Sequence, residues 1–302
     1  MLQILHKTKI DFMGWKHISF TLSALLILTG VIAIVQISRG KANLGIDFAG
    51  GTTVQLSFRE PLPIDEARKA LERNGLAGAS LQEFAEGNKI LIRLRESEGV
   101  SDRVVAIFKK EFPKRAFELD SVMEIGPVIG KALQRDALIA ITLSVIAIIF
   151  YIALRFEFKF GVTAAVATLH DVLAVLGVFF IVNKEINLLI VTALLTLAGY
   201  SLTDTVVVFD RIRENIKRAK REPLPQIVNN SINEVLSRTV ITSITVILVL
   251  VPLVIFGGEV LHDFSLALLY GVITGTYSSV FVASPLLVVW QEKSGGRLIT
   301  KR

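Results

Sequence analysis

Cysteine is absent from the 302 residues of the chain, which excludes disulfide bonds, thiolate metal sites and cysteine nucleophiles. Charge is scarce as well, since 20% of the residues are charged and 52% are hydrophobic. This balance is too apolar for one soluble domain and predicts a polytopic membrane protein that carries some aqueous mass. The sequence contains no phosphate-binding loop and no nucleophile–base pair, so we expect neither an enzyme nor a bound cofactor. The net charge is +6, but its placement in loops near membrane spans does not indicate nucleic-acid binding.

Six long apolar runs predict six transmembrane helices, because about 20 apolar residues cross the hydrocarbon core. These runs are residues 18–37, 136–154, 161–182, 188–209, 239–256 and 264–290. They are too long, and alternate too little, for the strands of a membrane barrel. The first run lacks a small-residue cleavage site after it, so we expect an uncleaved helix rather than a signal peptide. The last run contains Gly271, Gly275 and Pro285, which predicts a kink, and its GxxxG spacing is common at packing faces.

Lys and Arg in the termini and short loops predict the orientation of these helices. Basic residues are concentrated in the N-terminal segment 1–17, the loop 210–237 and the C-terminal segment 291–302. The two short loops on the opposite side contain one basic residue, Lys184. We therefore expect both termini, and the loop 210–237, to lie in the cytoplasm.

Residues 38–135 form one large outer segment with a different pattern. It predicts a strand over 44–58 with a Gly-Gly interruption, a helix over 64–74, and strands over 79–85 and 89–95 joined by a hairpin at Glu86-Gly87-Asn88. A helix over 100–112, capped by Ser101 or Asp102, and a strand over 115–124 follow. The order β-α-β-β-α-β is typical of the ferredoxin-like α+β fold, and no catalytic set of residues lies within it.

Asp204 is an acid inside the fourth apolar run, and a carboxylate at that depth costs several kcal/mol, roughly 2.5–3.5 on insertion scales. Thr196, Tyr200 and Ser201 precede it at helical spacing, which predicts a polar face on an otherwise apolar helix. Such an acid indicates a proton- or ion-coupled site. The alternative is an acid at the membrane interface that reaches water, since only about 9 Å of helix rise separates it from Asp210.

Arg238 stands at the cytoplasmic start of the fifth run, where antiparallel packing could bring it to the depth of Asp204. Burial favours the neutral form of a carboxyl group and a nearby Arg favours the ionised form, so alternation between the two suits a proton carrier. An Arg that anchors the helix end among headgroups is the alternative interpretation. His170 and Asp171, in the third run, could form a secondary proton relay or hydrogen-bond a neighbouring helix. A metal site would need more ligands than the chain supplies there.

Three motifs resemble the signature of the SecD/SecF protein-export family of the resistance-nodulation-division superfamily. They are LGIDFAGG at 44–51, IGPVIG at 125–130 and the stretch 199–214. Six spans with one outer domain of this size resemble the SecF branch rather than the SecD branch. In the first two motifs, Gly and Pro suit turns or hinges between the outer domain and the membrane, with ordinary linkers as the alternative. The residues concerned are Gly45, Asp47, Gly50, Gly51, Gly126, Pro127 and Gly130.

The resemblance implies a SecF-type subunit in the bacterial cytoplasmic (inner) membrane. Such a subunit binds SecD and the SecYEG translocon and helps to draw unfolded preproteins across the bilayer, using the proton motive force. The coupling ion would be H⁺, with Na⁺ as the alternative, and the resemblance points to Asp204 and Arg238 together with a carboxylate of SecD. Two other functions stay open: a passive scaffold subunit of a membrane complex, and half of a small-molecule efflux transporter. The second would require large domains in two outer loops, and this chain has one.

Overall fold

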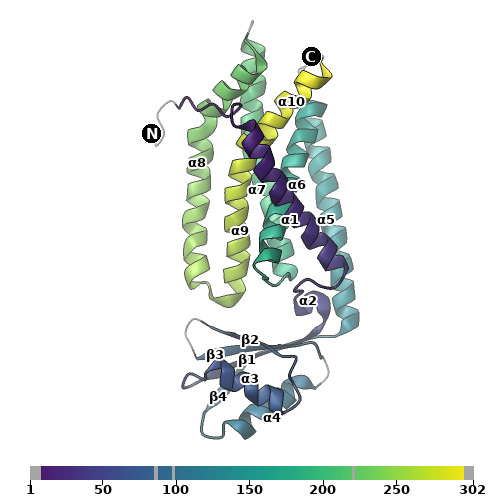
Figure 1. Cartoon of the computed structure of the whole chain (residues 1–302), viewed down its shortest axis with the longest axis vertical. Helices are drawn as coiled ribbons and strands as arrows, with labels where there is room; N and C mark the ends of the chain where they lie inside the picture. The colour runs from purple at the N-terminus through teal and green to yellow at the C-terminus, as the bar shows by residue number, and fades with distance from the viewer. Residues whose placement is uncertain (1–7, 85–87, 97–98, 220–221, 296–302) are drawn as a thin grey trace. The chain divides into compact units, whose positions relative to one another are not determined.

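The computed structural model describes residues 8–84, 88–96, 99–219 and 222–295, and the chain divides into two compact units (Figure 1). The helical unit contains the chain up to residue 43, residues 140–184, and the chain from residue 189. The sheet unit contains residues 44–139 and a separate short segment, 185–188. The chain therefore passes between the units at four places, where the sequence predicted two connectors.

Six helical segments among the described residues are long and apolar enough to cross a membrane, which confirms the predicted number of spans. The first five are α1 (Lys16–Ser38), α5 (Pro127–Arg155), α6 (Phe158–Ile181), α7 (Leu188–Arg218) and α8 (Leu224–Phe256). The sixth consists of α9 (Gly258–Ser278), a π-helical turn η1 (Ser279–Ala283) and α10 (Ser284–Ser294). The protein is a multi-pass membrane protein.

Three of these helices extend well beyond their apolar runs. Helix α5 begins at Pro127 rather than at residue 136, α7 continues to Arg218, and α8 begins at Leu224, so much of the predicted loop 210–237 is helical. Ion pairs at helical spacing support the polar end of α7: Arg211 pairs with Glu214 at 2.5 Å, and Arg218 pairs with Glu214 at 2.5 Å. Apolar runs locate only the part of a helix that crosses lipid.

The predicted interruption of the last span lies at η1, which ends two residues before Pro285. Proline has no backbone N–H and cannot complete the i→i−4 ladder, which accounts for the wider turn that precedes it. Gly271 and Gly275 serve for packing instead. A Cβ on Gly271 would lie 2.5 Å from Leu197 Cδ1, and one on Gly275 would lie 3.0 Å from Ser201 Cβ, so both glycines let α9 approach α7 closely.

Helix α1 lies across α6 in the helical unit (Figure 1). The crossing depends on two glycines, since a Cβ on Gly177 would lie 2.2 Å from Thr29 Oγ1 and 2.7 Å from the Gly30 nitrogen. A Cβ on Gly30 would lie 2.3 Å from the Leu173 carbonyl oxygen. No side chain fits at either position, so the two backbones are in direct contact.

The sheet unit is a four-stranded antiparallel sheet in the order β2-β3-β1-β4, with helices α3 (Ile64–Arg73) and α4 (Val100–Glu111) packed on it. The strands are β1 (Gly51–Phe58), β2 (Ser80–Glu83), β3 (Lys89–Leu94) and β4 (Phe117–Ile125). Alternate residues of β1, including Val54 and Leu56, form a core with Ile92, Leu71 and Phe108. The element order agrees with the predicted ferredoxin-like arrangement.

Two local predictions in this unit were wrong. Ile46–Ala49 form a short helix, α2, and the strand begins only at Gly51, because the chain turns at Gly50 with φ +73°. Helix α4 begins after Gly99, which adopts φ +64°, so Ser101 and Asp102 lie inside the helix and do not cap it. The predicted hairpin turn falls largely on residues 85–87, which lie outside the described residues.

Candidate functional site

Asp204 lies on the packed side of α7, with neighbours Leu202, Thr205 and Val208 also buried. Its side chain is 5% exposed, and its Oδ2 atom has no hydrogen-bond partner among the described residues. A buried carboxylate oxygen without a donor is costly in its ionised form, and protonation removes that cost. The position is therefore suited to a group that exchanges a proton.

Arg238 lies on α8 and is exposed on the surface of the chain. Its guanidinium acts electrostatically on the Asp204 carboxylate, but no hydrogen bond or ion pair within 4 Å joins them in the described part of the chain. Thr242 and Thr245, which continue this face of α8, donate to carbonyls of their own helix at 2.9 and 2.7 Å. Arg238 and Asp204 thus interact electrostatically without a direct contact, and their role as a proton-coupling pair stays a prediction.

The other predicted polar residues of α7 contact different neighbours. Thr196 donates to the Thr192 carbonyl of its own helix at 2.9 Å, and Tyr200 donates to Ser243 on α8 at 3.4 Å. Ser201 is fully buried and donates to Asp171 on α6. The polar face is divided because residues 200 and 201 point about 100° apart around the helix.

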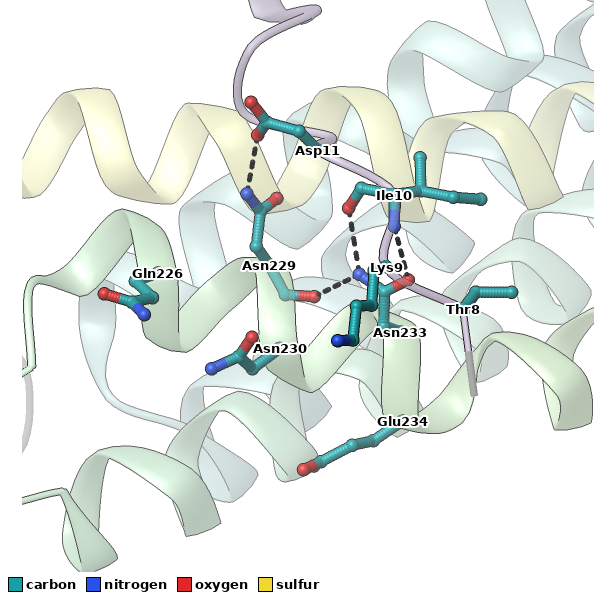
Figure 2. A pocket seen from close by; sticks show the side chains of 9 residues that line it. All are labelled: Thr8, Lys9, Ile10, Asp11, Gln226, Asn229, Asn230, Asn233 and Glu234. Carbon is teal, nitrogen blue, oxygen red and sulfur yellow. Dashed lines mark hydrogen bonds between the residues drawn. The ribbon is translucent and has the colours of Figure 1, made fainter. Parts of the chain in front are cut away.

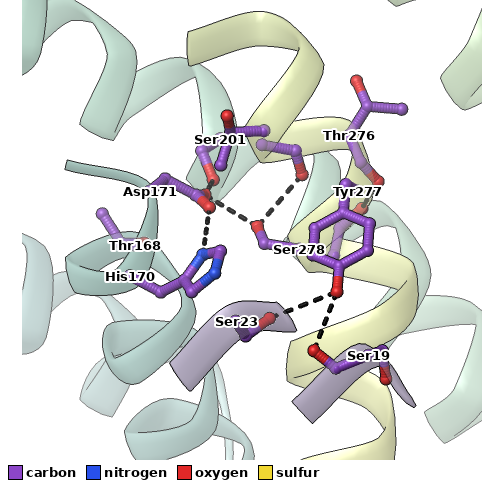
Figure 3. Close-up of polar contacts among 12 residues, drawn as sticks. Ser19, Ser23, Thr168, His170, Asp171, Ser201, Thr276, Tyr277 and Ser278 are labelled. Atoms are coloured by element: carbon purple, nitrogen blue, oxygen red, sulfur yellow. Dashed lines mark hydrogen bonds and ion pairs between the residues drawn. The ribbon is translucent and has the colours of Figure 1, made fainter. Parts of the chain in front are cut away.

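His170 and Asp171 form the centre of a buried cluster of polar side chains (Figure 3). The Asp171 carboxylate contacts His170 Nδ1 at 2.8 Å and accepts hydrogen bonds from Ser278 at 2.7 Å and from Ser201. His170 Nε2 has no partner in the described structure. One carboxylate therefore connects α6, α7 and α9, and the two adjacent residues face each other rather than a shared third group.

Further hydroxyl contacts connect the same helices to α1 and α8. Tyr277 donates to the Ser19 carbonyl at 2.9 Å and lies 3.2 Å from the Ser23 hydroxyl (Figure 3). Ser243 lies 2.6 Å from Thr276 Oγ1. Sequence reasoning missed Ser243, Tyr277 and Ser278, because isolated hydroxyl residues in apolar runs do not reveal which helices adjoin.

A second polar contact region joins the N-terminal segment to the beginning of α8 (Figure 2). The Asn233 side chain accepts from the Ile10 nitrogen at 3.0 Å and donates to the Ile10 carbonyl at 2.9 Å, as a neighbouring strand would. Asn229 accepts from the Met13 nitrogen at 3.1 Å and donates to Asp11 at 2.6 Å, and this bond holds the pKa of Asp11 below its usual value. A cavity of about 540 Å³ lies beside these contacts. The i, i+4 spacing of the two asparagines was the signal that could have revealed this region.

The glycines of the two predicted hinge motifs pack against each other inside the sheet unit. A Cβ on Gly130 would lie 3.1 Å from the Phe48 carbonyl oxygen, and one on Gly50 would lie 3.3 Å from Pro127 Cα. Gln134 donates to the Phe48 carbonyl at 2.7 Å. Gly51, with φ +133°, leaves no room for a side chain beside the Leu94 carbonyl, whereas Gly126 has open space around it. No group of three or more His, Asp or Glu side chains within the described ranges could hold a metal ion.

Comparison with known proteins identifies the family to which the chain belongs. The family model described as "Protein export membrane protein SecD/SecF, C-terminal" matches residues 104–293, and "SecD/SecF GG Motif" matches residues 41–61. The "Protein translocase subunit SecF" of Thermodesulfovibrio yellowstonii is 51% identical over 97% of this chain and 99% of its own length. This chain belongs to the SecF family. The SecF of Vibrio alginolyticus is 38% identical over 95% of this chain and 91% of its own length.

A solved structure related to the SecF family has the same fold. The crystal structure titled "SecDF, a translocon-associated membrane protein", from Thermus thermophilus, matches with a TM-score of 0.82 and 34% identity. The match covers 94% of this chain and 39% of that longer chain. This chain therefore spans about two-fifths of the length of that protein.

Proposed function

We propose that this protein is the SecF-type subunit of a complex with SecD that assists Sec-dependent export and is driven by the proton motive force. The relatives are named as translocase subunits, and the SecDF protein of Thermus thermophilus, whose title calls it translocon-associated, is a longer chain that includes the region matched here. The proposed setting is the bacterial inner membrane, with both termini in the cytoplasm and with the SecYEG translocon and unfolded preproteins as partners. The positions of Lys and Arg support this orientation.

The observation that carries the proposal is the buried Asp204 carboxylate with an oxygen that lacks a donor. When the group is neutral, its burial costs little; when it is ionised, it attracts Arg238 on the neighbouring helix. The two protonation states thus favour different positions of α7 and α8. A proton that enters from one side and leaves toward the other can bias a conformational equilibrium in this way.

Two membrane-spanning helices leave most of their apolar surface uncovered by the rest of the chain, which supports a partner protein within the membrane. Only 11% of the apolar window of α5 and 17% of that of α8 are buried within the chain. Arg238 is exposed on α8, where a carboxylate of SecD could complete the site. We propose SecD as the partner on the α8 face and lipid over the remaining apolar surface.

For the His170–Asp171 cluster we propose a structural role as an interhelical tie. Each oxygen of Asp171 has a hydrogen-bond partner, and the partners come from its own helix and two others. A tie of this kind holds Ser201 on α7, one turn before Asp204. If the cluster were a proton relay instead, Asp171→Asn would lose gradient-dependent export.

The direct test is export driven by a proton gradient in vesicles that contain the complex with the Asp204→Asn variant. We expect loss of gradient-dependent export with normal assembly with SecD, because the amide cannot carry a proton. The matched control is Thr203→Val, an exposed neighbour whose hydroxyl donates to the Gly199 carbonyl of its own helix, and it should export normally. Full gradient-dependent export by Asp204→Asn would favour a passive scaffold.

A further inference from the structure

We infer that residues 185–188 form a strap that fastens the start of α7 to the sheet unit, and that Gly45, Asp47 and Arg93 are the positioning residues that hold it. The role of the strap in coupling rests on the proposed function, whereas its attachment does not. The sequence predicted residues 185–187 as part of a short loop and Leu188 as the first residue of the fourth span. In the structure they leave the helical unit after Lys184, join the sheet unit, and continue into the helical unit at Leu189.

Backbone pairing attaches the middle of the strap. Leu44 and Ile186 form an isolated parallel bridge, and the Gly45 nitrogen donates to the Ile186 carbonyl at 3.0 Å. The Ile186 side chain is 4% exposed. The segment before α2 therefore pairs with the strap as one β-strand pairs with its neighbour.

Gly45 leaves the space that this pairing requires. A Cβ at this position would lie 2.5 Å from Glu185 Oε1 and 2.7 Å from Asn187 Cβ. Both distances are below ordinary contact, so a side chain here would displace the strap. This close approach gives a physical reason for a glycine five residues before the glycine pair at 50–51.

Asp47 binds the end of the strap. Its Oδ2 atom accepts a hydrogen bond from the Leu188 nitrogen at 3.0 Å, and Leu188 is the first residue of α7. The first N–H groups of a helix have no partner within the helix, and a negative charge there is favourable. Asp47 thus caps α7 from outside its own sequence neighbourhood.

Arg93 fixes the beginning of the strap to the sheet. Its guanidinium pairs with Glu185 at 3.0 Å, and the two side chains are 27% and 13% exposed. The same side chain donates to Gln82 on β2 at 3.0 Å, and Arg93 lies on β3 opposite Thr53 of β1. An ion pair this sheltered, held by a further hydrogen bond, is stronger than a fully exposed one.

The strap gives α7 a direct link to the sheet unit. Helix α7 runs without a break from Leu188 to Asp204, about 24 Å of helix rise. A displacement of α7 caused by the charge state of Asp204 would therefore reach Leu188 and, through Asp47 and Glu185, helix α2 and strand β3.

The attachment can be tested because the chain has no cysteine. Ile186→Cys places a single thiol on the buried strap, and its labelling by a membrane-impermeant maleimide measures how often the strap detaches. We expect Asp47→Ala or Arg93→Ala to raise the labelling rate about tenfold, as for loss of one hydrogen bond to a charged group. Asp47→Asn, which keeps an acceptor, should label slowly. The control Arg103→Ala removes an exposed pair with Glu96 in the same unit and should leave labelling unchanged.

The coupling role has a separate readout in gradient-driven export. Glu185→Arg should reduce gradient-dependent export, and the exchanged pair Arg93→Glu with Glu185→Arg should restore both export and slow labelling. Unchanged labelling in Asp47→Ala and Arg93→Ala would overturn the strap itself. Faster labelling with full gradient-dependent export would overturn its role in coupling. A failure of the proposed function, seen with Asp204→Asn, would leave the labelling results intact, so the two failures are distinguishable.

Discussion

Replacement of Asp171 should reveal how much the buried cluster contributes to helix packing. Its carboxylate receives bonds from His170, Ser201 and Ser278, and the latter two come from other helices. Interhelical hydrogen bonds in membranes contribute about 0.6 kcal/mol each on average, with a maximum near 1.7. Loss of the two interhelical contacts in Asp171→Ala should therefore lower the free energy of unfolding by about 1.2 kcal/mol, before any contribution from the intrahelical His170 bond or from a cavity.

The Asn variant separates a tie from a relay. Asp171→Asn keeps one oxygen for His170, and the two serine hydroxyls can rotate to accept from the amide. Ser278 already has the Gly275 carbonyl within 3.2 Å to receive its proton. We therefore expect Asp171→Asn to retain gradient-dependent export and most of the stability, although it cannot carry a proton.

Detergent-micelle unfolding monitored by tryptophan fluorescence and circular dichroism would give the stability, and vesicle export would give the function. The matched control is Thr168→Val, a buried neighbour on α6 whose hydroxyl donates to the Ala164 carbonyl of its own helix. It should change stability by a few tenths of a kcal/mol at most. Loss of export in Asp171→Asn with normal stability would refute the tie and favour a relay. Unchanged stability in Asp171→Ala would refute the packing argument.

Two further predictions concern the helical unit. Gly177→Val should destabilise the protein by about 1–3 kcal/mol in the same unfolding assay, because its side chain would overlap Thr29 and the Gly30 backbone. The control is Gly199→Ala, which should not destabilise the protein, because Gly199 has open space around it. The double change Asn229→Ala with Asn233→Ala should release residues 10–13 from α8 and raise their cleavage by a protease added on the cytoplasmic side. The pKa of Asp11 should also rise toward its ordinary value, because the hydrogen bond from Asn229 is lost. Unaltered cleavage would show that packing, rather than the two amides, holds the segment.

The architecture could be predicted from the sequence because its signals are local. Apolar runs indicate spans, and the order of strand and helix patterns in the outer segment indicated the ferredoxin-like arrangement. Asp204 was found for the same reason, since an acid within an apolar run is visible without knowledge of its neighbours. Helix ends were less accurate, as α5 and α8 show, because polar helical turns adjoin the spans.

Contacts between distant segments could not be predicted in this way. The sequence placed His170 and Asp171 in the third span but could not show that Ser201 and Ser278 bind the same carboxylate. Residues 185–187 resembled an ordinary loop before the predicted span at 188, since the partners Asp47 and Arg93 lie far away in the chain. Asp47 was predicted as a residue of a turn or hinge motif, and its observed partner is the first N–H of α7. Each of these contacts depends on which elements pack together, which a single sequence does not specify.

The most direct measurement concerns the protonation of Asp204 when the membrane is energised. Infrared difference spectra of the complex in vesicles, with and without an imposed proton gradient, would be compared between the native chain and Asp204→Asn. We expect a carboxyl band that changes intensity with the gradient in the native protein and is missing from the variant. A spectrum that is identical with and without the gradient would contradict proton coupling at this residue.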